Sequence, residues 1–245
     1  MIHHFDTLDS TNTKAKAMAQ AGAPHGTVVV ADHQTGGRGR LGRSFDSPAG
    51  GIYMSMILRP NCPPTQLMHL TCAVAVAVCN GVEQALGFRP QIKWINDLVV
   101  NGKKLAGILS ELSIDPKTGL VDFGIVGIGI NCNRKEQDFP AEFRTIACSA
   151  SMITGHPIDK NALLDEIIGT LRSMELSNKA DILQQYRRDC ITLGKEVVIH
   201  RGTSQLQGTA MDVTSDGALI VSFPDGRTET IDCGEVSVRG LYGYA

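Results

Sequence analysis

The chain has 245 residues, enough for one large domain or for a large domain followed by a small one. Its formal net charge of -2 gives no overall attraction to nucleic acid or to an anionic membrane, so any charged site must be local. The seven cysteines form neither a C-x-x-C pair nor a cluster with histidine at metal-ligand spacing, and no secretory signal opens the sequence. We therefore expect reduced thiols, no bound metal cluster and a cytoplasmic protein.

The first predicted elements are a strand over residues 2–8 and a helix over residues 13–21. Ser10, Thr11 and Asn12 lie at the start of this helix, where side-chain oxygens commonly cap exposed backbone N–H groups. The same place, at the positive end of a helix, also suits a polar ligand group. N-capping and ligand binding both stay open for these three residues.

A buried strand over residues 27–31 leads into a loop, residues 34–43, that places three arginines among four glycines. Its Gly-x-Gly-x-x-Gly spacing matches a dinucleotide-binding fingerprint, but a segment containing Pro and Gly follows in place of the required helix. Glycines let a backbone approach a ligand, and guanidinium groups bind carboxylate and phosphate. We interpret the loop as an anion-binding site formed by Arg38, Arg40 and Arg43; the alternative is a solvated basic loop.

The middle of the chain predicts a sheet with a core helix. Residues 51–58 alternate as a strand with Tyr53 and Ser55 on one face, and residues 66–87 are apolar nearly all round, which indicates a core helix. The longest apolar run, residues 70–79, is too short to span a bilayer. The protein is therefore expected to have no membrane association.

Further strands are predicted over residues 91–95, 98–100, 103–111 and 120–130, and Asn-Gly at 101–102 is a strong hairpin signal. The last strand contains Gly124, Gly127 and Gly129. Glycines within a strand indicate that something approaches the backbone closely, which could be a ligand or tight packing.

Helices are predicted over residues 160–174 and 179–191, and five short strands are predicted after them, between residues 195 and 239. Short strands with turn signals favour a small antiparallel barrel. We therefore predict two domains, residues 1–192 and residues 193–245.

Five motifs in this order together resemble biotin protein ligases, and the resemblance covers nearly the whole chain. The motifs are Asp9-Ser-Thr-Asn12, Gln34-Thr-Gly-Gly-Arg-Gly-Arg-Leu-Gly-Arg43, Lys93-Trp-Ile-Asn-Asp97, Lys104-Leu-Ala-Gly-Ile-Leu109 and Gly127-Ile-Gly-Ile-Asn131. The C-terminal Glu235-Val-Ser-Val-Arg239 is also similar to the family's last module.

This resemblance implies an α/β (α+β) fold: a mixed sheet with flanking helices, like that of class II aminoacyl-tRNA synthetases, followed by a small Src-homology-like β-barrel. It implies a two-step reaction in which the biotin carboxylate attacks the α-phosphate of ATP, giving biotinyl-5'-AMP, and the biotin then passes to a lysine of a biotin carboxyl carrier protein. ATP with Mg²⁺ and biotin are the implied small molecules.

The resemblance also implies roles for individual residues. Biotin contacts are expected from Ser10, Thr11, Asn12, Gln34, Gly37, Arg38, Gly39, Arg40, Tyr53, Ser55, Lys104 and Gly107. Nucleotide contacts are expected from Arg40, Arg43, Phe45, Asn96 and Asn131. The expected catalytic residues are Arg38, Arg40, Asp97 and Lys104, with Asp97 as the carboxylate nearest Mg²⁺.

Three positions depart from the family pattern: Gly36, Phe45 and Ile95 stand where alanine, tryptophan and proline are common. None of them removes a charged group, so activity is still expected. Because the chain begins a few residues before Asp9, we expect a ligase without the DNA-binding domain that some relatives carry.

Two alternatives remain for the function: a lipoate or octanoate ligase, and a non-catalytic sensor of biotin or nucleotide. Relatives suggest a possible homodimer. We expect the loop at residues 38–45 to act as a lid that is ordered by ligand.

Overall fold

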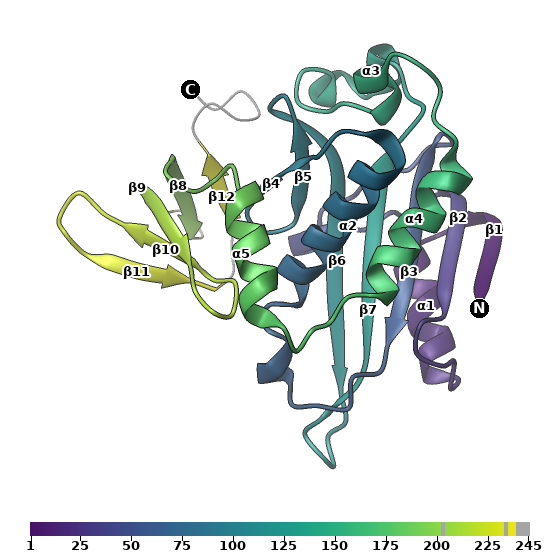
Figure 1. The fold of residues 1–245 in the computed structure, drawn as a ribbon, viewed down its shortest axis with the longest axis horizontal. Coiled ribbons are helices and arrows are strands. Elements are labelled where there is room, and N and C mark those ends of the chain that lie inside the picture. Colours follow the sequence, from purple (N-terminus) through teal and green to yellow (C-terminus); the bar gives the residue numbers. More distant parts are fainter. Residues whose placement is uncertain (202–203, 233–234, 239–245) are drawn as a thin grey trace.

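A seven-stranded sheet forms the centre of the protein in a computed structural model that describes residues 1–201, 204–232 and 235–238 (Figure 1). Its strand order is β1-β2-β3-β7-β6-β5-β4, with β1 and β2 parallel and all other neighbours antiparallel. The strands are β1 (Ile2–Leu8), β2 (Val28–Gln34), β3 (Gly51–Leu58), β4 (Gln91–Lys93), β5 (Asp97–Val100), β6 (Lys103–Ile114) and β7 (Val121–Asn131). The predicted mixed sheet is confirmed.

Helices cover both faces of this sheet (Figure 1). Helix α1 (Thr11–Gln20) packs on one face, where Ala15 and Ala19 join a small apolar cluster. The opposite face carries α2 (Leu70–Leu86), α4 (Lys160–Arg172) and α5 (Lys179–Asp189), while α3 (Ala150–Thr154) is a single short turn. All eight residues of β3 are buried, as expected for a strand covered on both sides.

Helix α2 is the predicted core helix. Together with the turn before it, residues Pro64–Leu86, it is long and apolar enough to cross a membrane by length and composition. However, 72% of its most apolar window is buried inside the protein. This burial is what the core helix of a folded domain shows, and α2 ends at Gly87, whose φ of 73° places it in the left-handed region.

The hairpin predicted at Asn101-Gly102 joins β5 to β6, and both residues have positive φ, 50° and 74°. Two successive positive φ angles are typical of the type I′ turn that this dipeptide favours. The strand predicted over residues 91–95, by contrast, ends at Lys93. Residues 94–96 form the turn that reverses the chain into β5, where Asp97 pairs with Lys93. In this turn the Trp94 backbone N–H donates to Thr192 Oγ1 (2.9 Å) and its indole Nε1 to the Gly217 carbonyl (2.9 Å).

The five short strands predicted near the C-terminus are confirmed among the described residues. They are β8 (Glu196–Arg201), β9 (Ser204–Val213), β10 (Leu219–Ser222), β11 (Thr228–Ile231) and β12 (Glu235–Val238), in the order β11-β10-β9-β8-β12. Their buried side chains belong to the same apolar cluster as α2 and the large sheet. The domain boundary at residues 192/193 stays a prediction, and residues 239–245 of the second predicted domain lie outside the described part.

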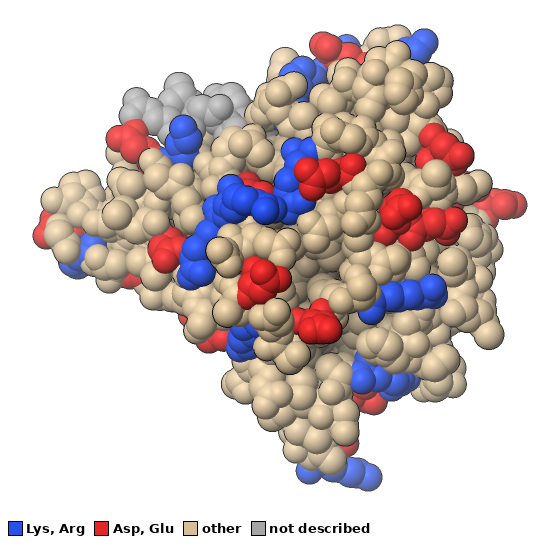
Figure 2. Space-filling view, in the orientation of Figure 1, with Lys and Arg blue, Asp and Glu red and all other residues tan. Residues whose placement is uncertain are grey.

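Charged side chains of both signs are interspersed over the face shown in Figure 2. This distribution agrees with the small net charge of -2. A highly charged ligand would therefore be attracted by charged side chains gathered at one site, such as the cavity beside the arginine-glycine loop, and not by the protein as a whole.

Candidate active site

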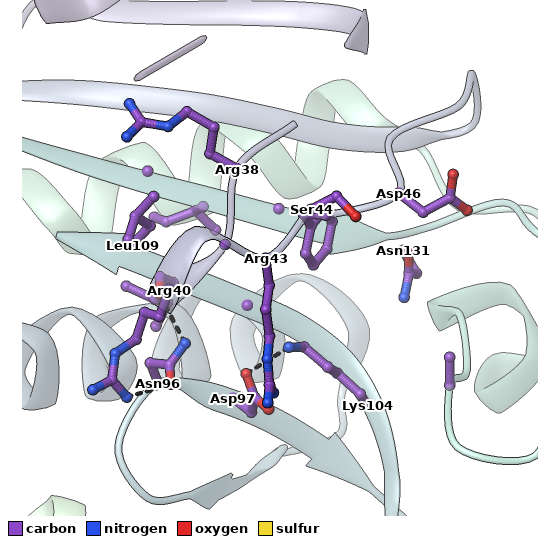
Figure 3. Close-up of a pocket in the computed structure, with 18 of the residues that line it drawn as sticks. Arg38, Arg40, Arg43, Ser44, Asp46, Asn96, Asp97, Lys104, Leu109 and Asn131 are labelled. Carbon is purple, nitrogen blue, oxygen red and sulfur yellow. Dashed lines mark hydrogen bonds and ion pairs between the residues drawn. The ribbon is translucent and has the colours of Figure 1, made fainter. Parts of the chain in front are cut away.

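A cavity of about 620 Å³ lies where the arginine-glycine loop passes over β5, β6 and β7 (Figure 3). It is lined at one end by the start of α1, and at the other by the turn before β5, the segment after β7 and part of β12. Its lining includes Ser10, Thr11, Asn12, Gln34, Arg38, Gly39, Arg40, Arg43, Phe45, Asp46, Asn96, Asp97, Lys104, Gly107, Leu109, Asn131, Arg134, Val236 and Ser237.

The end of the cavity beside α1 is polar. Ser10 is the N-cap residue of α1 by its extended backbone, yet its side chain makes no cap hydrogen bond. Thr11 donates its backbone N–H to Gln34 Oε1 (2.8 Å), and Asn12 Nδ2 donates to Glu111 Oε2 (2.7 Å). For Ser10, Thr11 and Asn12 the sequence allowed either N-capping or ligand binding. In the structure all three line the cavity, and their side chains do not cap the helix.

The arginine-glycine loop folds over the cavity and closes on itself. Gly39 donates its N–H to the Arg43 carbonyl (2.7 Å), and Phe45 donates to the Gly37 carbonyl (2.9 Å). Between them a short 3-10 turn, Arg40–Gly42, places Leu41 at φ 56° and leaves its side chain 68% exposed. The loop is thus held by its own backbone, with an apolar tip in solvent.

The arginines of the loop point in two directions (Figure 3). Arg43 extends toward Asp97 and Lys104, and Arg40 extends toward Asn96, where its Nη1 donates to Asn96 Oδ1 (3.1 Å). Arg38 extends the other way and pairs with Glu111 (Nη2 to Oε1, 3.4 Å). The loop therefore connects the polar end of the cavity to a second end rich in cations.

At that second end, Lys104 Nζ pairs with Asp97 Oδ1 at 2.6 Å and lies 5.8 Å from the centre of the Phe45 ring. The lining contains more Lys and Arg than Asp and Glu, with Lys93 and Arg134 adding to the loop arginines. A cluster of this sign suits a phosphate or carboxylate group, since fixed donors and cations stabilise negative charge without reorganising.

Glycines on β6 and β7 make the floor of the cavity. A Cβ on Gly129 would meet Phe45 Cε1 at 2.5 Å, and a Cβ on Gly127 would overlap the Asn12 amide. At Gly124, by contrast, the nearest atom is Leu112 Cδ2 at 3.1 Å. The close approach that these glycines predicted is therefore made by protein side chains, two of which line the cavity.

Comparison with known proteins decides the family. The family model described as biotin/lipoate A/B protein ligase matches residues 4–131, more than half of the chain, and the biotin protein ligase C-terminal domain matches residues 192–239. The chain belongs to the biotin protein ligase family.

Several relatives of this ligase resemble it over most of their length. It is 36% identical to the bifunctional ligase/repressor BirA of Bacillus subtilis, covering 92% of the chain and 70% of the relative. It is 32% identical to the biotin–[acetyl-CoA-carboxylase] ligase of Paracoccus denitrificans, covering 95% and 98%. The biotin protein ligase of Aquifex aeolicus, solved in complex with biotin and ATP, superposes with a TM-score of 0.80 at 29% identity, covering 97% and 98%. The protein is accordingly an enzyme with the biotin ligase fold.

Most residues that sequence assigned to the site of this ligase meet at the cavity, but three do not line it: Gly37, Tyr53 and Ser55. Tyr53 is fully buried, donates its hydroxyl to the Pro48 carbonyl (2.7 Å), and has its pKa raised by burial. Gly37 is packed against Phe45 and Ser47, which leaves no room for a Cβ. Ser55 is fully buried beneath Thr11 and Asn12. These three support the site from behind.

Sequence reasoning missed several residues of the site. Glu111 lies two and four residues beyond Leu109 and Gly107 on β6, so the alternation of a strand places it on the same face and could have identified it. Arg134 is buried, pairs with Asp46 (2.7 Å) and lies 4.0 Å from the Phe139 ring centre. Val236 and Ser237 of β12 belong to the Glu235–Arg239 segment that resembles the family's last module, but nothing in that segment indicates a place at the cavity. Arg134 carries no local signal, because only the tertiary fold brings it there.

Proposed function

We propose that this ligase binds biotin and ATP in the cavity, joins them as biotinyl-5'-AMP, and transfers biotin to a lysine of a biotin carboxyl carrier protein. The observation that carries the proposal is the polarity of a single cavity: hydrogen-bonding groups at the α1 end, where Arg38 is paired with Glu111, and an excess of cations at the Lys104 end. Biotin has a neutral ureido ring at one end and a carboxylate at the other, so its two ends match the two ends of this cavity.

The chemistry requires positioning and charge stabilisation more than a nucleophile of the enzyme. With the ureido ring beside Thr11 and Asn12, the biotin carboxylate would extend toward Lys104. The ammonium of Lys104 would then lie near both the carboxylate and the α-phosphate, where negative charge accumulates as the anhydride forms. Arg43 extends toward Lys104 and Arg40 toward Asn96, next to Asp97 in the sequence, and both would hold the phosphates of the nucleotide and the adenylate product.

Mg²⁺ is the usual partner of ATP in such enzymes, and the side chains of this cavity suit it as an ion shared with the phosphates of ATP. Among the residues that the structure describes there is no group of three or more His, Cys, Asp or Glu side chains that could hold a metal by themselves. Mg²⁺ is commonly held by one or two carboxylates together with substrate phosphates. Asp97 would supply the carboxylate, with Asn96 beside it, and the ion would offset phosphate charge during adenylation.

Pyrophosphate release in the presence of Mg-ATP and a candidate acid tests the first step. We expect release with biotin and none with lipoate or octanoate; the reverse result would make the protein a lipoate-type ligase. Replacing Lys104 with Ala should lower the adenylation rate by about 100-fold or more, the scale of losing one transition-state charge contact. A wild-type protein that binds biotin but releases no pyrophosphate would favour the sensor.

We also propose a cytoplasmic enzyme with no nucleic-acid or membrane partner. The six cysteines that the structure describes are all free, which suits a reducing compartment. A homodimer is supported by the position of β1 at an edge of the large sheet. Sedimentation velocity tests the dimer, and a salt-dependent mobility shift of an operator duplex would contradict the absence of DNA binding.

A further inference from the structure

Glu111 on β6 has no part in the proposed chemistry, yet its carboxylate contacts both the polar end of the cavity and the loop. One oxygen accepts from Asn12 Nδ2 (2.7 Å), and the other lies 3.4 Å from Arg38 Nη2. The Glu111 side chain is 30% exposed, so it is partly shielded from solvent. One carboxylate thus joins a residue of helix α1 to the first arginine of the loop.

Because an ionised carboxylate can only accept, Glu111 determines how the Asn12 amide is oriented. The amide NH₂ faces Glu111, with a second, longer contact to the Leu109 carbonyl (3.5 Å), and Asn12 Oδ1 faces Ser55 Oγ at 2.6 Å. An amide turned the other way would place its oxygen against the carboxylate, which is repulsive.

The orientation of Asn12 in turn fixes the hydroxyl protons behind it. Ser55 Oγ lies 2.6 Å from Asn12 Oδ1 and 2.8 Å from Thr11 Oγ1. Since Asn12 Oδ1 can only accept, the Ser55 hydroxyl donates to it. The Thr11 hydroxyl donates to Gln34 Oε1 (3.1 Å), which also accepts the Thr11 backbone N–H (2.8 Å).

The same hydrogen-bonded chain continues to the far end of the loop. Gln34 Nε2 donates to Ser47 Oγ (2.9 Å), and Ser47 Oγ donates to the Phe45 carbonyl (2.8 Å). This series of hydrogen bonds therefore runs from Arg38 in the loop, through Glu111 and the polar end of the cavity, to Phe45 just beyond the loop. Its members are Arg38, Glu111, Asn12, Ser55, Thr11, Gln34, Ser47 and the backbone carbonyl of Phe45.

We infer that Glu111 is a positioning residue for biotin binding, an inference that rests on the proposed function. It acts through Asn12, whose amide orientation sets the donor and acceptor pattern of the cavity, and through Arg38, which it ties to the sheet. Loss of the carboxylate lets Asn12 adopt both amide orientations, so a smaller fraction of the protein is ready to bind.

Isothermal titration with biotin tests this inference on four proteins: wild type, Glu111→Ala, Asn12→Ala and the double variant. Two Asn12 orientations of similar energy halve the fraction of protein that is ready to bind, so Glu111→Ala should weaken biotin binding by about twofold or more. If Glu111 acts through Asn12, the same substitution should have little further effect in the Asn12→Ala background. For Glu111→Ala under saturating biotin, kcat and the KM for ATP should stay within about threefold of the wild-type values, because the substitution affects biotin binding alone.

Two further variants separate positioning from folding. Glu111→Gln keeps the shape of the side chain, but its amide can donate as well as accept and so no longer selects one Asn12 orientation. It should therefore fold as wild type does and lose biotin affinity about as Glu111→Ala does. Asp122→Asn removes the carboxylate of a similar exposed pair, Arg59 to Asp122 at 3.3 Å, away from the cavity, and should bind biotin as wild type does.

Three results would overturn the inference: unchanged biotin affinity in Glu111→Ala, fully additive losses in the double variant, or a loss in Asp122→Asn as large as in Glu111→Ala. The titration measures binding without catalysis, so these results are independent of pyrophosphate release. A wild-type protein that binds no biotin would instead refute the proposed function and this inference with it.

Discussion

Replacing Gly127 with Ala tests whether the polar end of the cavity is built as described. The new Cβ would occupy the space of the Asn12 amide, so Asn12 must move away from β7. The displaced amide loses its bond to the Glu111 carboxylate and its contact with Ser55. A hydrogen bond to a charged group contributes about 1.5–3 kcal/mol and a neutral one about 0.5–1.5 kcal/mol, which together make roughly 2–4.5 kcal/mol.

If this loss falls mainly on ligand binding, biotin affinity should fall by about 30-fold or more, since 1.4 kcal/mol corresponds to a factor of ten. Isothermal titration measures the affinity, and thermal melting shows how much of the loss falls on folding. Gly124→Ala on the same strand is the matched control, because its Cβ would meet the end of the flexible Leu112 side chain at 3.1 Å and no other atom closer than 3.7 Å. Wild-type affinity in Gly127→Ala, or an equal loss in Gly124→Ala, would refute the reasoning.

Three other predictions concern pH, the link between the two sheets and the loop. Asp189 is buried; burial raises the pKa of its carboxyl, but hydrogen bonds from Arg89 and Arg188 outweigh it and hold the pKa below its usual value. Its contribution to stability is therefore present above about pH 4 and lost as the pH falls through the lower folded pKa. Asp189→Asn should lose about 3–5 kcal/mol of unfolding free energy at pH 7. When the unfolding free energy is measured by urea denaturation at a series of pH values, it should fall less steeply below about pH 4 in this variant than in the wild type; an equally steep fall would contradict this. Trp94→Phe removes the donor to the Gly217 carbonyl and should lower the unfolding free energy by about 1–3 kcal/mol, whereas a wild-type value would show that water replaces the indole. Residues 38–45 should lose protease sensitivity when biotin and Mg-ATP are added, and equal cleavage with and without ligand would make the loop a static wall.

Local chemistry explains which parts of this fold could be predicted from sequence. The Asn101-Gly102 hairpin depends on the φ angles of two adjacent residues, and Gly127 and Gly129 reported a close approach to the backbone that the structure attributes to Asn12 and Phe45. Motifs of this kind can be recognised from a few neighbouring residues, without knowledge of the tertiary fold. The strand predicted through Ile95 was too long because the chain already turns at residues 94–96, so that Asp97 pairs back with Lys93.

The candidate site shows the same division. The loop arginines and Lys104 could be assigned because their charge and spacing are visible in sequence, and the resemblance to a family supplied their roles. Arg134 could not be predicted, since its pairing with Asp46 and its stacking on Phe139 exist only in the folded chain. Tyr53 was placed on the correct strand, but alternation alone could not tell a cavity wall from the buried layer behind it.

The measurement that tests the central claim most directly is the mass of a biotin carboxyl carrier domain after incubation with this protein, biotin and Mg-ATP. The proposed reaction predicts an increase of one biotin on a single lysine, and a greatly slowed increase with Lys104→Ala. An unchanged mass with the wild-type protein, under conditions in which it binds biotin and ATP, would contradict the assignment of ligase activity to this cavity.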